Sequence, residues 1–406
     1  MFNFKVANDN GNSEHKMIIE GEVIKQPNVY KVFTGEQPQT DETLQKLVED
    51  LNNNILVKIE SKSLGTEAFR YLVGNSALST SKGRVKNMNI EKNKKHEEKL
   101  PLINTLGLIG AQAIKRKFAE NETIADGTTI PVVVDMTTAI PASVYKKSNA
   151  DQFESMFTDS LHELRFYIKD ISVNVQITFR FVKVTQEGVP ALFSIIENGE
   201  GKFRNDDLFD EFKEEYSYEK VTGKHFSDKK ILHLDIGEGT TELTYTQGYA
   251  AHAAKSSGVP LGIGQAIQTA TDLFNEGEDL KFSRQLFSNH LKNPLSDYHE
   301  EAILYLNQSK QVVAQDLLDE VENKVREINA DLEVLVVYGG ASILLKDSLY
   351  EKLVNLGKKR KFEVLWVPEK YAVEMNVQGM HIFNTIKLEQ LVKEAQENQG
   401  DTITSK

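Results

Sequence analysis

Residues 233–244 read HLDIGEGTTELT, and this stretch decides the fold that the sequence predicts. An apolar strand ends at Asp235, and two glycines and two threonines follow before the next strand begins. Glycine accepts positive φ angles and lets backbone N–H groups approach an anion closely. An Asp-x-Gly turn is nevertheless common turn chemistry. Taken alone, the stretch therefore predicts a hairpin.

A second stretch near the N-terminus, FKVANDNGNSEHKMII (residues 4–19), follows the same plan. It has an apolar strand, Asp9 at its end, Gly11 two residues later, small polar residues, and then another strand. Aspartate repels a phosphate but can hold Mg²⁺, which prefers a few carboxylates together with phosphate oxygens. Lys16 supplies the positive charge that a polyphosphate needs. Two such turns in one chain favour a divided phosphate site over two unrelated hairpins.

A third element, VLVVYGGASILL (residues 334–345), is an apolar strand that ends at Gly339-Gly340 and opens directly into a helix. A helix N-terminus offers unpaired N–H groups, and small residues let a ribose or a flat ring lie against the backbone. The spacing is not the G-x-G-x-x-G of dinucleotide-binding folds. The element therefore predicts a nucleoside contact of a different kind.

Together these residues resemble the superfamily of actin and heat-shock-chaperone ATPases. All five motifs of that superfamily occur in its order and span most of the chain. They are the first phosphate loop (Asp9–Lys16), the first connecting segment (Thr138-Ala139-Ile140-Pro141), the second phosphate loop (Asp235–Thr241), the adenosine motif (Val337–Ser342) and the second connecting segment (Tyr371–Met380).

Finer features resemble the ParM-like bacterial actins of plasmid segregation. One is a strand that ends in V-G-x-x-A, here residues 73–77. Another is a β-hairpin over residues 172–195, in which ALFSII pairs with a long strand across the turn Gln186-Glu187-Gly188. We expect this hairpin to follow a helix over Asp151–Tyr167, and we expect an earlier helix over Leu102–Phe118.

The resemblance implies an α/β chain with the actin-like ATPase fold, in which two related α/β domains surround a nucleotide cleft. Domain I would comprise residues 1–228 and 357–406, and domain II would comprise residues 229–356. The cofactors implied are Mg²⁺ and ATP, with GTP as the alternative nucleotide.

The resemblance also implies roles for individual residues. Asp9 and Asp235 would hold the hydrated Mg²⁺, and Asp235 and Glu238 would take part in hydrolysis. Gln152 or Glu154, on the first connecting helix, would orient the attacking water; the sequence leaves open which. The nucleotide would be contacted by Asn10, Gly11, Asn12, Ser13, Lys16, Gly237, Gly239, Thr240, Thr241, Gly264, Arg284, Gly339, Gly340, Ala341 and Ser342. Asn12 and Glu238 depart from the usual serine and the usual aspartate or glycine.

Composition limits the class of protein. The chain has 406 residues, no cysteine and a net charge of −12. The charge argues against direct binding to nucleic acid, and the absence of cysteine excludes disulfides and zinc–thiolate sites. No apolar run is long enough for a membrane span, and the N-terminus lacks a signal-peptide layout. We therefore expect a cytoplasmic protein that is not associated with a membrane.

These features favour a polymerising actin-like ATPase. It would form head-to-tail filaments that segregate plasmid DNA through a centromere-binding adaptor protein. Two alternatives stay open. One is a small-molecule kinase of the same superfamily, although no further aspartate motif for an acceptor hydroxyl is evident. The other is a non-polymerising division scaffold, for which the C-terminal stripe of Ile386, Leu388, Leu391, Val392 and Ala395 could be a membrane anchor or a docking face. A chaperone is disfavoured by the short stretch that follows the adenosine motif.

Overall fold

The chain divides into two compact units. The computed structural model describes residues 1–36, 40–66, 68–80, 83–88 and 94–404. The first unit is Met1–Lys202 with Asn376–Lys406, and the second is Phe203–Met375. Residues 203–228 and 357–375 therefore fall in the second unit, whereas the sequence assigned them to domain I. The reason is pairing within the second sheet: β16 (Glu363–Trp366) lies parallel to β15 (Val334–Tyr338), and the amide of Val364 donates to the hydroxyl of Tyr216.

The first unit is built on one large sheet. Its ten described strands follow the order β3-β2-β1-β8-β10-β9-β5-β6-β4-β7. The central strands β1, β8 and β10 run parallel, and the outer pairs are antiparallel. In chain order the strands are β1 (Phe2–Asn10), β2 (Glu14–Ile19), β3 (Glu22–Pro27), β4 (Val29–Phe33), β5 (Leu56–Glu60), β6 (Arg70–Val73), β7 (Lys86–Asn87), β8 (Thr129–Ile140), β9 (His162–Ile168) and β10 (Ile171–Gln186).

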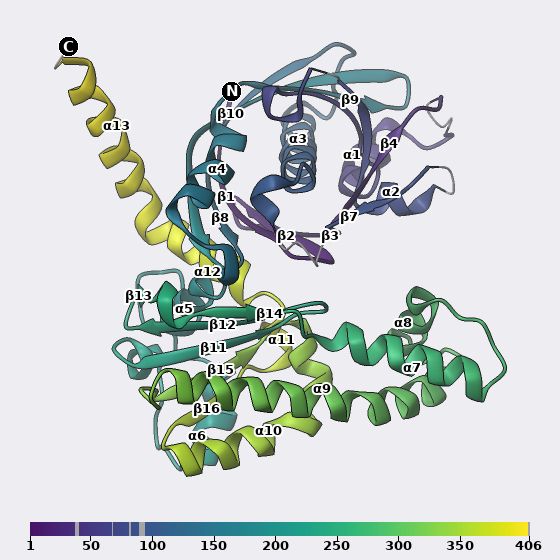
Figure 1. The fold of residues 1–406 in the computed structure, drawn as a ribbon. Coiled ribbons are helices and arrows are strands. Elements are labelled where there is room, and N and C mark those ends of the chain that lie inside the picture. Colours follow the sequence, from purple (N-terminus) through teal and green to yellow (C-terminus); the bar gives the residue numbers. More distant parts are fainter. Residues whose placement is uncertain (37–39, 67, 81–82, 89–93, 405–406) are drawn as a thin grey trace. The chain divides into compact units, whose positions relative to one another are not determined.

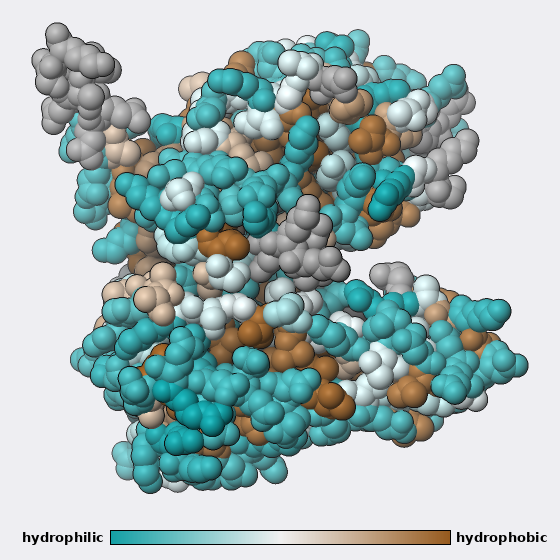
Figure 2. Space-filling model, in the orientation of Figure 1, coloured by the Kyte–Doolittle hydropathy of each residue, from teal (hydrophilic) through white to brown (hydrophobic). Residues whose placement is uncertain are grey.

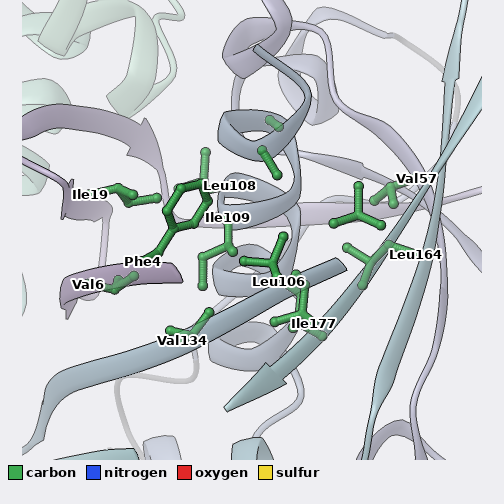
Figure 3. Packing of buried hydrophobic residues seen from close by; sticks show 14 of the residues in the cluster. Phe4, Val6, Ile19, Val57, Leu106, Leu108, Ile109, Val134, Leu164 and Ile177 are labelled. Carbon is green, nitrogen blue, oxygen red and sulfur yellow. The ribbon is translucent and has the colours of Figure 1, made fainter. Parts of the chain in front are cut away.

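The sheet curls around helix α3 (Leu100–Asn121), as Figure 1 shows. Every residue of α3 from Leu100 to Ile114 is buried, as expected for a helix that is enclosed on all sides. Figure 3 shows Leu106 and Ile109 of this helix among strand side chains that include Val134 and Ile177. The other helices of this part are α1 (Leu44–Glu49), η1 (Leu51–Asn53), η2 (Lys62–Leu64), α2 (Asn75–Ser79), η3 (Lys95–Glu97), η4 (Ala142–Val144), α4 (Lys147–Thr158) and α5 (Val189–Ile196).

Two sequence predictions fail in this unit. The helix expected over Asp151–Tyr167 ends at Thr158, and His162–Ile168 is strand β9, whose side chains alternate between the buried and the more exposed face. The expected hairpin partner, ALFSII, lies in helix α5. The real hairpin joins β9 to β10, so β10 pairs with the strand that precedes it. A short apolar run such as ALFSII does not distinguish a strand from a buried helix by its pattern.

The second unit has a smaller sheet in the order β13-β12-β11-β15-β16, with β14 paired to β12. Its strands besides β15 and β16 are β11 (Lys230–Ile236), β12 (Thr241–Gln247), β13 (Ala250–Ala251) and β14 (Ser257–Val259). Its helices are η5 (Asp207–Phe209), α6 (Asp210–Tyr216), η6 (Gly223–Phe226), η7 (Ala253–Lys255), α7 (Ile263–Gly277), α8 (Arg284–Lys292), α9 (His299–Glu327), α10 (Gly340–Arg360) and α11 (Glu369–Ala372). A separate apolar cluster forms its core.

The C-terminal residues return to the first unit through α12 (Met375–Phe383), the π-helical turn η8 (Asn384–Leu388) and α13 (Glu389–Thr404). The side chain of Asn384 donates to the carbonyl of Val6 at 2.9 Å and accepts from Thr137 at 2.5 Å. Leu388 and Val392 of the apolar stripe are buried. This burial favours the docking face over the membrane anchor.

The described residues contain no helix that is both long and apolar enough to cross a bilayer. Hydrophilic residues cover most of the visible face of each unit, and hydrophobic residues appear there as small separate areas (Figure 2). Single exposed apolar side chains of this kind are normal on protein surfaces.

Candidate functional site

The first phosphate loop is the turn between β1 and β2. Asp9 pairs with Lys16 and Asn10 with His15, and the amide of Gly11 donates to the carbonyl of Asp9 at 3.1 Å. A Cβ on Gly11 would lie 2.6 Å from the carbonyl oxygen of Glu14. The turn is therefore too tight for any side chain at this position. Gly11 and Asn12 are partly exposed, and Ser13 is exposed.

Two buried asparagines hold this turn in place. Asn28 donates through Nδ2 to the carbonyl of Gly11 at 2.6 Å, and its backbone amide donates to the carbonyl of Ser13 at 2.9 Å. Asn104 of α3 donates in turn to Oδ1 of Asn28 at 2.8 Å. Both asparagines are almost fully buried. The loop is thus tied to the core helix at its two ends.

Charged groups sit at the mouth of the same turn. The ammonium of Lys16 lies 3.8 Å from a carboxylate oxygen of Asp9 and 3.7 Å from one of Glu14. The side chains of Lys16 and Asp9 are only 14% and 11% exposed. The turn thus holds a cation and a carboxylate side by side, the two kinds of group that a magnesium polyphosphate requires.

Beneath the loop lies a polar network. His15 and Asn8 share a hydrogen bond of 2.6 Å, and the Nδ2 atoms of Asn8 and Asn10 both donate to Thr105 of α3, at 3.1 and 3.2 Å. Asn10 was expected to contact nucleotide, but its side chain is buried in this network. Burial first, and then the charges of Lys95 and Lys16, lower the pKa of His15 to about 3. The imidazole is therefore neutral at physiological pH.

The parallel strands β1, β8 and β10 bring a further carboxylate to this edge of the sheet. Asn8 of β1 lies opposite Thr138 of β8, and Gln186 of β10 lies opposite Ile140 of β8. Glu187 follows directly, and its amide donates to the carbonyl of Ile140 at 2.9 Å. Ligands of open α/β sheets bind at the carboxyl ends of such strands.

Glu187 is a candidate that the sequence reasoning missed. Its carboxylate accepts a hydrogen bond from the ammonium of Lys95, and burial raises its pKa although Lys95 opposes that shift. The charges of Asp9 and Lys16 also act on it. The sequence signal was a carboxylate immediately after a long strand, which we interpreted as part of a hairpin turn.

The two residues expected to orient water both lie on α4. Gln152 is exposed, and Glu154 is partly buried. Burial, followed by the charge of Asp151, raises the pKa of Glu154, and Lys183 opposes this shift. The groups that act on Glu154 therefore come from its own helix and from β10, whereas Asp9 and Lys16 act on Glu187.

The second phosphate loop connects β11 to β12 in the second unit. The amide of Gly237 donates to the carbonyl of Thr240 at 2.9 Å, which closes the turn. The start of α7 packs against it, because Gly264 donates to the carbonyl of Glu238 at 2.7 Å. A Cβ on Gly264 would lie 2.8 Å from that carbonyl oxygen. Gly264, expected to contact nucleotide, is thus needed for close packing on the loop itself.

Glu238 pairs with Arg284, the first residue of α8. The two side chains are 34% and 44% exposed. The unusual glutamate of the second loop therefore has a cation partner on helix α8. Arg284 was expected beside the adenine or ribose, and the structure places it beside the second phosphate loop.

The adenosine motif directly adjoins the second loop. Strands β11 and β15 run parallel with Asp235 opposite Tyr338. Gly339 follows with a φ of +94°, and a Cβ there would lie 2.5 Å from Oδ1 of Asp235. Gly340, where α10 begins, is exposed, and a Cβ on it would meet no atom within 4 Å. Backbone at this helix N-terminus is thus open beside a carboxylate.

Some side chains that were expected to contact the nucleotide instead form hydrogen bonds within the protein. The hydroxyl of Thr241 donates to the carbonyl of Leu261 at 2.7 Å, and that of Ser342 donates to the carbonyl of Gly339 at 2.8 Å. Both residues, and Ala341, are buried. Asn12, Gly237, Gly239 and Thr240 are partly exposed, and Ser13 is exposed.

The described residues contain no group of three or more histidine, aspartate or glutamate side chains that could by itself hold a metal ion. Asp9 and Asp235 belong to different units.

Comparison with known proteins establishes the fold. The actin-like protein Alp7A superposes with a TM-score of 0.70 at 13% identity over 98% of this chain and 100% of that one. The chain has the actin-like fold. The apo form of psk41 ParM has a TM-score of 0.60 at 16% identity over 97% and 100% of the two chains. ParM of Bacillus thuringiensis with ATP has a TM-score of 0.61 at 15% identity over 96% and 100%.

The similarity lies in the structure rather than in the sequence. No family model and no curated protein sequence matches the chain. Because the identities are this low, the actin-like fold is recognised by its structure. Its main features in this chain are the two sheets, their parallel central strands and the glycine turns at their edges. Functional roles for single residues rest on the contacts described above.

Proposed function

We propose that this chain is an actin-like ATPase that binds ATP with Mg²⁺ and assembles into head-to-tail filaments. The observation that carries the proposal is the contact between Gly339 and Asp235 in the second unit, matched by the Asp9–Lys16 turn in the first. Each motif supplies a different part of what a nucleotide needs. ParM of Bacillus thuringiensis, which shares the fold, has been solved with ATP, AMPPNP and ADP.

In this proposal each unit supplies its own groups. Backbone amides of residues 12–13 and 238–240 hold phosphate oxygens, whereas those of Gly11 and Gly237 close their own turns. Lys16 neutralises the charge of the phosphates. Asp9 and Asp235 are the carboxylates for Mg²⁺, which when bound neutralises charge on the phosphates. The open N-terminus of α10 at Gly340 receives the nucleoside. Phosphoryl transfer depends mainly on positioning and charge stabilisation, so what these groups leave to be supplied is a residue that orients the attacking water.

We assign the orientation of the attacking water to Glu187 in preference to Gln152 and Glu154. Glu187 stands at the carboxyl end of β10, one strand from β8 and two from β1, which leads into the first phosphate loop. Its raised pKa brings a carboxylate closer to the range in which it accepts a proton at neutral pH. Gln152 is exposed and Glu154 responds to a different set of charges.

Light scattering and phosphate release, recorded together on the purified protein, test the proposal. We expect scattering to rise after addition of ATP and Mg²⁺ and to fall as phosphate is released. GTP in a parallel series decides the nucleotide preference. The proposal of a filament is wrong if scattering stays flat over a wide range of protein concentration, and the proposal of an ATPase is wrong if no phosphate appears.

The biological role that we propose is segregation of plasmid DNA in the cytoplasm through a DNA-bound adaptor. It is supported by the similarity in fold to ParM and by the acidic charge, which disfavours direct contact with DNA. Loss of a plasmid from cells that lack this chain, with retention when the chain is restored, tests this role. A hydrolysis assay with candidate sugars tests the alternative of a small-molecule kinase.

A further inference from the structure

A buried lysine outside all five motifs contacts the candidate catalytic carboxylate. Lys95 belongs to η3, the short helix that precedes α3, and its side chain is only 2% exposed. Its ammonium donates to Oε1 of Glu187, whose side chain is 14% exposed. The two residues are 92 positions apart in sequence, so the contact is purely tertiary.

A buried ion pair of this kind needs an explanation. Removing two charges from water costs several kcal/mol per ion, and well-packed apolar residues of similar volume are often equally stable or more so. Stability alone is therefore a weak reason to place a lysine here. A role in holding Glu187 in place is a stronger reason, because Glu187 stands at the carboxyl ends of the parallel strands.

The surroundings limit where the Glu187 carboxylate can point. Its backbone is held by the hydrogen bond to the carbonyl of Ile140 at 2.9 Å. The charged groups that act on the carboxylate are Lys95, Asp9 and Lys16. Asp9 repels it, and Lys16 is already paired with Asp9 and Glu14. Lys95, by contrast, donates a hydrogen bond directly to Glu187.

We propose that Lys95 is a positioning residue for Glu187, fixing its carboxylate at the sheet edge in the orientation and ionised form that hydrolysis requires. This inference rests on the proposed function. Lys95 acts only through Glu187: its ammonium holds one carboxylate oxygen and so sets the direction in which the carboxylate group faces the attacking water. Nucleotide affinity depends on the two phosphate loops and should not depend on Lys95.

Four variants test the proposal in the full-length protein: Lys95→Gln, Glu187→Gln, the double variant, and Lys94→Gln as control. Lys94 neighbours Lys95 but is exposed and pairs with Glu97 at 2.9 Å. For each variant, single-turnover phosphate release gives the hydrolysis rate and a fluorescent ATP analogue gives the dissociation constant. Thermal melting reports folding.

We expect Lys95→Gln to slow hydrolysis at least about tenfold while the dissociation constant changes by less than about twofold, a split that general loss of structure would not produce. Lys94→Gln should match the wild type in both. The double variant should hydrolyse ATP at the rate of Glu187→Gln, because a residue that acts only through Glu187 has no effect once that carboxylate is gone.

Two results would overturn the inference. One is Lys95→Gln that hydrolyses ATP at the wild-type rate. The other is a double variant that is several-fold slower than Glu187→Gln, which would give Lys95 an independent role. The second comparison holds even when Lys95→Gln alone does not fold, because the double variant carries neither charge of this buried pair. A wild-type protein without hydrolysis would instead refute the proposed function, and the inference with it.

Discussion

Gly339 lies against the carboxylate of Asp235 so closely that a Cβ on the glycine would be 2.5 Å from Oδ1 of the aspartate. The φ of Gly339 is +94°, a conformation that residues with a side chain rarely adopt. The strand pairing of β11 with β15 creates this contact, because it sets Asp235 opposite Tyr338. Two motifs that are distant in the sequence are thereby one structural feature of the second unit.

Gly339→Ala should therefore destabilise the second unit and weaken nucleotide binding. The strained backbone costs on the order of 1–3 kcal/mol, before the clash with Asp235 is added. We expect a lower melting temperature and a dissociation constant for ATP raised at least about tenfold. Gly340→Ala is the matched control for stability, since a Cβ there would meet no atom within 4 Å. Its free energy of unfolding should stay within about 0.5 kcal/mol of the wild type. Equal losses of stability in both variants would contradict the role of the Asp235 contact.

Asn28→Ala should loosen the first phosphate loop. The substitution removes the side-chain hydrogen bond to Gly11 and leaves the Nδ2 group of Asn104 without its acceptor on Asn28. Unpaired buried polar groups cost about 1–3 kcal/mol, so urea denaturation should show a loss of that size. Affinity for ATP should fall as well. Asn54→Ala, at an exposed site that bonds only within its own turn, should change neither quantity measurably. Full affinity in Asn28→Ala would show that the clamp does not position the loop.

Glu238→Ala should slow hydrolysis and leave nucleotide binding mostly intact, as expected for a group that acts after binding. Glu238 also pairs with Arg284, so a slower rate in Glu238→Ala is explained either by loss of the carboxylate itself or by loss of this ion pair. Arg284→Ala removes the same pair from the other side and separates the two causes. The pair is about a third to a half exposed, and exposed pairs contribute about 0–1 kcal/mol. Neither variant should therefore unfold. Unchanged turnover in Glu238→Ala would assign this residue to the surface.

His15 should make the first unit less stable in mild acid. Its pKa is about 3 in the folded chain and about 6.5 in an unfolded one. Well above pH 6.5 the imidazole is neutral in both states. As the pH falls below about 6.5 only the unfolded chain takes up the proton, so the free energy of unfolding drops by up to about 1.4 kcal/mol per pH unit until the folded pKa is reached.

His15→Gln removes this titration. Between about pH 6.5 and about pH 5 the wild type should lose up to about 2 kcal/mol more of its free energy of unfolding than the variant does. Urea denaturation at the two pH values measures the difference. The variant's own cost, from the lost bond to Asn8, is the same at both values and cancels. Parallel pH dependence of the two proteins would contradict the assignment.

Much of the fold followed from local patterns. The enclosed helix α3 and the strands that flank each glycine turn were predicted from apolar periodicity and turn residues. The strand β9 was missed because its apolar residues continued a helical spacing from α4. Helix α5 was missed because a short apolar run fits either state. The predicted domain boundaries differ from those of the two units because the pairing of β16 with β15 cannot be read from a local sequence pattern.

The sequence by itself determined the turns: Gly11, Gly237 and Gly339 stand where the backbone must bend tightly or approach another chain segment, and Asp9 and Asp235 stand close to them in the chain or in the sheet. Only the tertiary structure decided which other side chains join these turns. The parallel pairing of β10 with β8 brings Glu187 to the edge of the sheet that holds the first loop. Lys95 reaches Glu187 across 92 positions, and Arg284 reaches Glu238 from helix α8. Turn chemistry is encoded within a few residues, whereas strand order and buried charge pairs depend on contacts that no local pattern contains.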